Sequence, residues 1–99
     1  MVHENWRFRP YYRNLKAWLD AGLVGDIAAI RLDFHSSGMI ARPDGRPALV
    51  RQPFFRHEQR LLVMEVLIHH LDTLRYLLGE FDLDAARLSR SNDDILGED

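Results

Sequence analysis

One apolar stretch, from about Glu58 to Gly79, constrains the fold of this chain more than any other feature. Its apolar residues fall on nearly every side of a helix: Leu61, Leu62, Val63, Met64, Val66, Leu67, Ile68, Leu71, Leu74, Leu77 and Leu78. A helix that is apolar all round is expected to be buried. The stretch therefore predicts a central helix that other elements cover.

Four polar residues interrupt this apolar helix at regular steps. Glu65, His69, Asp72 and Tyr76 follow one another at spacings of four, three and four, which places them on one narrow stripe of a helix. An unpaired buried carboxylate or imidazole is costly, so these side chains need partners or a wet cleft.

The stripe has three interpretations. In the first it is a structural network, with Glu65 bonded to His69, and Asp72 bonded to a backbone amide or to Arg75. In the second His69 transfers a proton while Glu65 orients its ring, because imidazole titrates near neutral pH. The third is a metal site shared by Glu65, His69 and His70, although no H-E-x-x-H pattern accompanies them.

Length and composition limit the classes of function. The 99 residues predict one small domain, too short to hold a nucleotide-binding domain as well as a substrate domain. Well-mixed charges with a net charge of -2 indicate neither a nucleic-acid nor a membrane partner. The chain lacks cysteine and an apolar amino-terminal run, so the expected location is the cytoplasm.

Pro10 to Ala21 is predicted to form an amphipathic helix. Tyr12, Leu15 and Trp18 recur at a helical spacing, and polar residues fill the opposite face. Pro10 suits the first helical position, and Gly22 suits the carboxyl cap.

Two segments have the alternation of strands. Ile27 to Ser36 alternates apolar and polar side chains, and Leu83 to Ser89 does so more weakly. The predicted fold class is therefore α+β, with two main helices packed on one face of a small, mainly antiparallel or mixed open sheet. The element order is helix, strand, long loop, helix, strand.

The long loop is predicted from Ser36 to His57, where glycine and proline recur without a helical or strand period. Loops of this length in a compact domain are often binding segments. Arg51, Gln52, Phe54 and Phe55 stand together just before the apolar helix. Either the two rings attach the loop to the core, or Arg51 and Gln52 contact a substrate.

Three motifs in order resemble the Gfo/Idh/MocA oxidoreductases. They are E-N-W-R-F-R-P (Glu4 to Pro10), A-G-L-V-G-D-I (Ala21 to Ile27) and E-V-L-I-H-H-L-D-T-L-R-Y-L-L-G-E (Glu65 to Glu80). The resemblance covers nearly the whole chain and corresponds to the first part of the family's carboxyl-terminal domain. It implies helices on one face of a largely antiparallel open sheet, whose other face often forms the subunit interface.

The resemblance also implies a chemistry. Members of the family transfer hydride between NAD or NADP and a hydroxyl carbon of a sugar, inositol or related polyol. His69 would handle the hydroxyl proton, and Glu65 stands where the family usually has an aspartate. Asp72 matches the acidic residue after the histidine, and Arg7 matches a position near the active-site cleft. The predicted substrate-binding residues are Arg7, Arg51, Gln52 and Asp72.

The glycine-rich dinucleotide fold and the E-K-P segment with the family's catalytic lysine are not in this sequence. We therefore expect residues 1–99 to be a fragment of a dehydrogenase carboxyl-terminal domain, binding no cofactor or metal itself and inactive alone. One alternative is a self-standing ligand-binding or interaction module with the same fold, and another is a small metal-dependent enzyme.

A homodimer or higher homo-oligomer is also expected. A sheet of two strands is marginal by itself, and its open edges are templates for pairing with a second copy. The polar face with Arg31, Asp33 and His35 could pair across the same two-fold axis.

Overall fold

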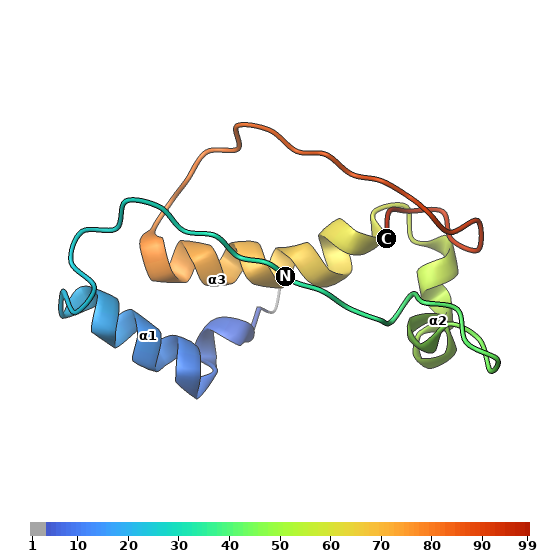
Figure 1. Cartoon of the computed structure of the whole chain (residues 1–99), viewed down its shortest axis with the longest axis horizontal. Helices are drawn as coiled ribbons and strands as arrows, with labels where there is room; N and C mark the ends of the chain where they lie inside the picture. Colours follow the sequence, from blue (N-terminus) through green and yellow to red (C-terminus); the bar gives the residue numbers. More distant parts are fainter. Residues whose placement is uncertain (1–3) are drawn as a thin grey trace. The chain divides into compact units, whose positions relative to one another are not determined.

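The computed structural model describes residues 4–99 as helices joined by extended segments (Figure 1). The elements are η1 (Trp6–Phe8), α1 (Pro10–Asp20), α2 (Pro47–Arg51), η2 (Pro53–His57), the π-helical η3 (Val63–Leu67) and α3 (Ile68–Leu78). They belong to two compact units, each assembled from two separate stretches of chain. The first unit combines Met1–Leu32 with Leu67–Asp84, and the second combines Asp33–Val66 with Ala85–Asp99.

The predicted amino-terminal helix is confirmed as α1. Pro10 is its first residue, where the missing N–H of proline costs nothing. After the helix, the Gly22 N–H donates to the Leu19 carbonyl and the Leu23 N–H donates to the Trp18 carbonyl, both at 3.1 Å. Gly22 has a φ of +74°, which glycine adopts without a steric penalty. This pair of bonds is a Schellman cap, and it explains why the helix ends here.

Within the first unit, α1 and η1 both pack against α3 (Figure 1). The buried side chains of α3 are His70, Thr73 and Leu77, which recur at three and four residues on one face. The Thr73 hydroxyl donates to the His69 carbonyl at 2.8 Å, so this buried polar group is satisfied inside the helix.

The prediction of one buried helix from about Glu58 to Gly79 is wrong in two respects. The helical stretch begins at Leu61 and passes through the π-helical η3 before it continues as α3. Met64 is exposed, as are Leu67, Leu71 and Leu78. Within residues 4–99 the neighbouring elements cover only the face of α3 with its three buried residues, so composition alone overstated the burial.

The predicted α+β fold is also wrong, because no strand or sheet forms within residues 4–99. The structure has a single antiparallel bridge there, between Arg42 and Gly45. Residues 27–36 and 83–89 are exposed and carry no assigned structure. A strand needs a neighbour whose N–H and C=O groups pair with its own. Apolar alternation predicts a segment suited to a sheet, but it does not supply that neighbour.

The predicted long loop contains two short helices. Pro47 begins α2 and Pro53 begins η2, each in the position where proline favours a helix start. The core of the second unit consists of Ala48, Leu49, Phe55, Leu61 and Ile95, with Met39 packed against it. Phe55 packs in this core, as one of the two interpretations expected of both rings, whereas Phe54 is exposed with its ring edge-on to Phe55, at 4.9 Å between centroids.

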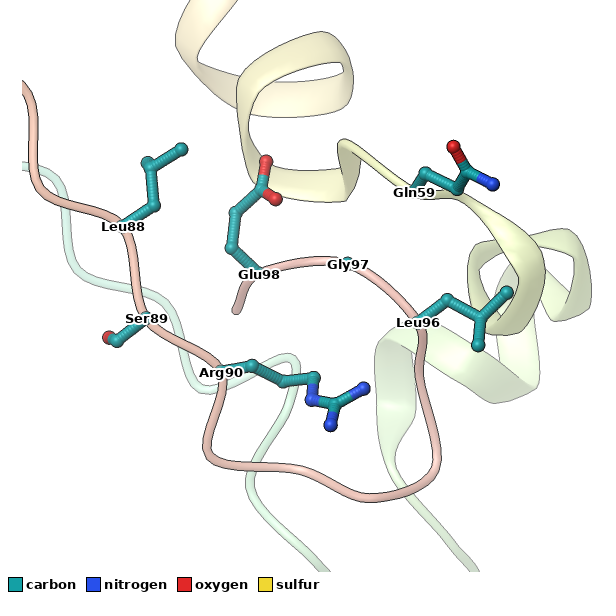
Figure 2. A pocket seen from close by; sticks show the side chains of 7 residues that line it. All are labelled: Gln59, Leu88, Ser89, Arg90, Leu96, Gly97 and Glu98. Atoms are coloured by element: carbon teal, nitrogen blue, oxygen red, sulfur yellow. The ribbon is translucent and has the colours of Figure 1, made fainter.

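The chain end of the second unit packs tightly on the start of the helical stretch. A Cβ at Gly97 would lie 2.6 Å from the Glu58 carbonyl oxygen and 2.8 Å from the Leu61 nitrogen. The buried Glu98 accepts a hydrogen bond from the Val63 N–H at 2.9 Å, and Figure 2 shows its side chain directed at that helix. These contacts require glycine at position 97 and satisfy an orphan donor at the helix start.

Candidate functional site

The candidate site lies in the first unit, where the segment before η1 meets α3. The Nδ1 atom of His69 is 2.7 Å from Oε2 of Glu4, a residue that sequence analysis did not single out as functional. The His69 side chain is 29% exposed, whereas that of Glu4 is 12% exposed. The carboxylate is therefore mostly buried against an imidazole that retains access to solvent.

Trp6 fixes the plane of the His69 ring. The two rings stack with 4.7 Å between centroids and an angle of 11° between planes. Trp6 also meets His70 edge-on, with centroids 5.1 Å apart and an angle of 85°. The Arg9 guanidinium carbon lies 4.1 Å from the Trp6 ring centroid, a cation–π contact. Trp6 is thus held by three neighbours and in turn limits rotation of His69.

A second link joins η1 to α3 beside this stack. Arg7 donates from Nε to Oδ2 of Asp72 at 2.8 Å, and from Nη2 to the other carboxylate oxygen. The Arg7 guanidinium carbon also lies 5.7 Å from the Tyr76 ring centroid. The hydrogen bond to Asp72 raises the pKa of Arg7 above its ordinary value, and the negative charge of Asp72 acts in the same direction. Arg7 therefore stays charged, and the pair is a fixed feature of the site.

His70, next to His69 in sequence, has a different environment. It is 6% exposed, and burial lowers its pKa below the ordinary histidine value, with a smaller contribution from the charge of His69. The neutral form of His70 is therefore favoured, which suits a packing residue more than a proton donor.

The geometry around His69 suits proton transfer. Within residues 4–99 the other ring nitrogen, Nε2, has no hydrogen-bond partner, while Nδ1 faces Glu4. A partly exposed imidazole whose Nδ1 faces a carboxylate can accept a proton at Nε2 from a small molecule, or return one. In the described part of the chain, no group of three histidine, aspartate or glutamate side chains is arranged to hold a metal ion.

The structure brings together three of the predicted site residues, Arg7, His69 and Asp72, in the first unit. Glu65 is half-buried in η3, and Arg51 and Gln52 are exposed at the end of α2, all in the second unit.

Sequence analysis missed the functional potential of Glu4 and Trp6. The available signal was the density of aromatic and charged residues in E-N-W-R-F-R-P. That density indicated contact with other groups but could not identify His69 as the partner.

An open pocket of about 240 Å³ lies in the second unit (Figure 2). Its lining residues are Gln59, Leu88, Ser89, Arg90, Leu96, Gly97 and Glu98. Arg90 donates to the Ile95 carbonyl at 3.1 Å, and Glu98 accepts from Val63. Both charged residues thus have structural bonds, and the pocket is best understood as part of the packing of the chain end. No helix in the described residues is both long and apolar enough to cross a membrane.

Comparisons with known proteins give three matches over the full length of the chain. Two are D-apiose dehydrogenases, from Rhizobium rhizogenes and Paraburkholderia graminis, each 33% identical over 99 residues, and the chain covers 26% and 24% of their lengths. The third is the crystal structure of an oxidoreductase from Agrobacterium radiobacter in complex with NAD+, L-tartaric acid and magnesium. It is 30% identical with a TM-score of 0.68, and the chain covers 27% of it.

No established protein-family profile matches the sequence, so the resemblance to the Gfo/Idh/MocA oxidoreductases stays a prediction. The chain spans about a quarter of the length of each of the three proteins it matches. Over its whole length, the chain is therefore similar to one part of known oxidoreductases.

Proposed function

We propose that this chain is one part of a larger NAD- or NADP-dependent oxidoreductase of the Gfo/Idh/MocA type, which acts on a hydroxyl group of a sugar or related polyol. Residues 1–99 would belong to its carboxyl-terminal domain. The similarity to two D-apiose dehydrogenases and to an NAD+-bound oxidoreductase supports the class of reaction. The observation that carries the proposal is the geometry of His69, whose Nδ1 faces Glu4 and whose side chain is partly exposed.

The residues of this chain do not fit a dinucleotide. Pyrophosphate sites are typically glycine-rich turns that open into a helix. In the described residues, α1 begins after Arg9 and α2 begins after Arg46, and the sequence has no G-x-G-x-x-G motif. We therefore propose that the cofactor binds to another part of the larger protein.

The part of this chain in the reaction would be proton transfer. When a hydroxyl is oxidised to a carbonyl, its carbon loses a hydride and its oxygen loses a proton. His69 would accept that proton at Nε2, and in the reverse direction it would return the proton. Glu65 is proposed to assist His69, and Arg7, Arg51, Gln52 and Asp72 are proposed to contact substrate hydroxyls.

The test is kinetic and uses the full-length protein that contains this segment. Reduction of NAD+ and NADP+ is followed with D-apiose and with a panel of aldoses and polyols. His69→Ala should lower kcat by about 10²- to 10⁴-fold, the usual contribution of a positioned acid–base group. The control is His57→Ala, which alters an exposed histidine in η2. A kcat that stays within about threefold in His69→Ala, well short of that contribution, would favour the structural-network interpretation.

We also propose that the larger protein self-associates. Without a sheet, support comes from large apolar side chains that are exposed one after another along a single stretch of the first unit: Leu23, Val24, Ile27, Ile30 and Leu32. Contiguous exposed apolar residues are typical of interaction surfaces. Light scattering across a dilution series tests this, and a single-chain mass at every concentration would contradict it.

A further inference from the structure

We infer that Glu4 is the positioning residue of His69. Its carboxylate holds the imidazole in the tautomer with hydrogen on Nδ1, which leaves the Nε2 lone pair directed away from Glu4 to receive a proton. The structural part of this inference stands alone, whereas its catalytic consequence rests on the proposed function. The orienting role predicted for Glu65 thus has a second candidate, 65 residues from His69 in sequence.

The argument begins with the short contact between Glu4 and His69. Oε2 and Nδ1 are 2.7 Å apart, within the range of a charge-assisted hydrogen bond. A carboxylate can only accept hydrogen bonds, so the nitrogen that faces it must carry the hydrogen. In a neutral imidazole the other nitrogen is then the acceptor. Glu4 is only 12% exposed, so water competes weakly for this bond.

The ring stack makes the orientation specific. Rotating the His69 ring by half a turn would place a carbon where Nδ1 now faces Glu4. The parallel Trp6 ring at 4.7 Å opposes the intermediate tilted positions, and Arg9 at 4.1 Å from Trp6 holds the indole in place. The Glu4 carboxylate therefore fixes which edge of the imidazole faces it, and the Trp6 indole fixes the plane of the ring.

The backbone that carries Glu4 is held as well. Arg7 is three residues further along and forms the two-bonded pair with Asp72, which is three residues after His69. The Phe8 N–H donates to the Asn5 carbonyl at 3.1 Å, which closes the η1 turn between them. Two links with the same offset thus join the η1 region to α3, so Glu4 does not rely on its own hydrogen bond for its position.

The catalytic consequence follows from charge. When His69 accepts a proton at Nε2 it becomes positive, and its Nδ1–H still donates to the Glu4 carboxylate. The other charged or titratable groups near the ring are Arg9 across Trp6, the Arg7–Asp72 pair and the neighbouring His70. Glu4 is the carboxylate in direct contact with this imidazole, whereas Asp72 is bonded to Arg7.

The first experiment reads the tautomer directly by nuclear magnetic resonance of the chain labelled with ¹⁵N-histidine. Only five histidines contribute signals, and the exposed His35 and His57 serve as internal references. At about pH 9, well above the ordinary histidine titration, His69 should carry its hydrogen on Nδ1. Glu4→Ala, which removes the acceptor that a glutamine would keep, should shift His69 toward the mixture of tautomers seen at the references. The matched control is Glu80→Ala, which removes an exposed carboxylate of the same unit.

The second experiment measures kinetics in the full-length protein. Glu4→Gln should lower kcat by about 10-fold or more, within the range of acid–base catalysis, while KM changes much less. Glu4→Asp, which keeps the charge, should recover part of the loss, and Glu80→Gln should change neither constant.

The outcomes separate the inference from the proposed function. A His69 that carries its hydrogen on Nε2, or whose tautomer does not respond to Glu4→Ala while circular dichroism shows an intact fold, overturns the inference. A tautomer that responds as expected, together with an unchanged kcat in His69→Ala, supports the inference and overturns the proposed function.

Discussion

Arg7 donates hydrogen bonds to both carboxylate oxygens of Asp72, joining η1 to α3 across 65 residues of sequence. The side chains are 32% and 14% exposed, so the carboxylate is the more buried partner. Two-bonded arginine–carboxylate pairs fix orientation as well as distance. This pair therefore helps to hold η1 against α3, beside the stack of Trp6 on His69.

Breaking the pair should destabilise the first unit. Arg7→Met leaves a mostly buried carboxylate without its partner, and we expect a loss of about 1–2 kcal/mol. This is less than for a completely buried pair, because water reaches part of Arg7. Urea denaturation followed by tryptophan fluorescence measures the loss, since both tryptophans lie in this unit. Arg75→Met removes the exposed Arg75–Glu80 pair and should leave the midpoint unchanged. Equal midpoints in the two variants would contradict the prediction.

The buried His70 predicts a dependence of stability on pH. Burial lowers its pKa in the folded state, so the unfolded chain takes up a proton as pH falls below about 6.5 while the folded chain does not. Because the unfolded state then binds more protons, the free energy of unfolding should decrease as the pH is lowered from about 7 toward the pKa of His70 in the folded state. His70→Gln should flatten this slope in denaturation curves, whereas His57→Gln in the second unit should not. An unchanged slope in His70→Gln would contradict the assignment of this pH dependence to His70.

Gly97→Ala should disrupt the second unit. The added Cβ would lie under 3 Å from two backbone atoms, Glu58 O and Leu61 N, and neither can move as a flexible side chain would. Overpacking of this kind costs about 1–3 kcal/mol. Gly38→Ala is the control, because its nearest neighbours are side-chain atoms at 3.3 Å. Circular dichroism during denaturation compares the variants, and equal effects would show that the chain end adapts easily.

The chain alone should not bind NAD+ or NADP+. The described helices lack a glycine turn aimed at a pyrophosphate, as the starts of α1 and α2 show. Isothermal titration calorimetry with each nucleotide measures this directly. Binding tighter than roughly 100 μM, which is above weak nonspecific association, would mean that a nucleotide site was overlooked.

The sequence predicted local structure best where the signals lie within one turn. Pro10 begins α1 and Gly22 caps its end, because the backbone preferences of these residues act on immediate neighbours. The strand predictions were wrong because an alternating segment does not itself encode a pairing partner. Without that partner, Ile30 and Phe34 remain exposed. The η3 segment was not predicted because Val63 and Leu67 suit an α-helix or a π-helix equally in their apolar pattern.

The sequence predicted only some of the residues of the candidate site. Helical spacing placed His69 and Asp72 on a common stripe, and the resemblance added Arg7 near them. Glu4 was not identified, because its contact with His69 spans 65 residues and no periodicity connects the two. Such pairs depend on how separate segments pack, which a single sequence does not reveal.

The interleaving of the two units has a consequence for how the chain acquires its structure. Both long links of the first unit, Arg7–Asp72 and Glu4–His69, close loops of 65 residues, at an entropic cost on the order of 4 kcal/mol for the first closure. That loop contains the entire 33–66 stretch of the second unit. During synthesis the amino-terminal stretch must therefore wait for α3 to leave the ribosome before either link forms, and closing this loop should be slower than forming the individual helices.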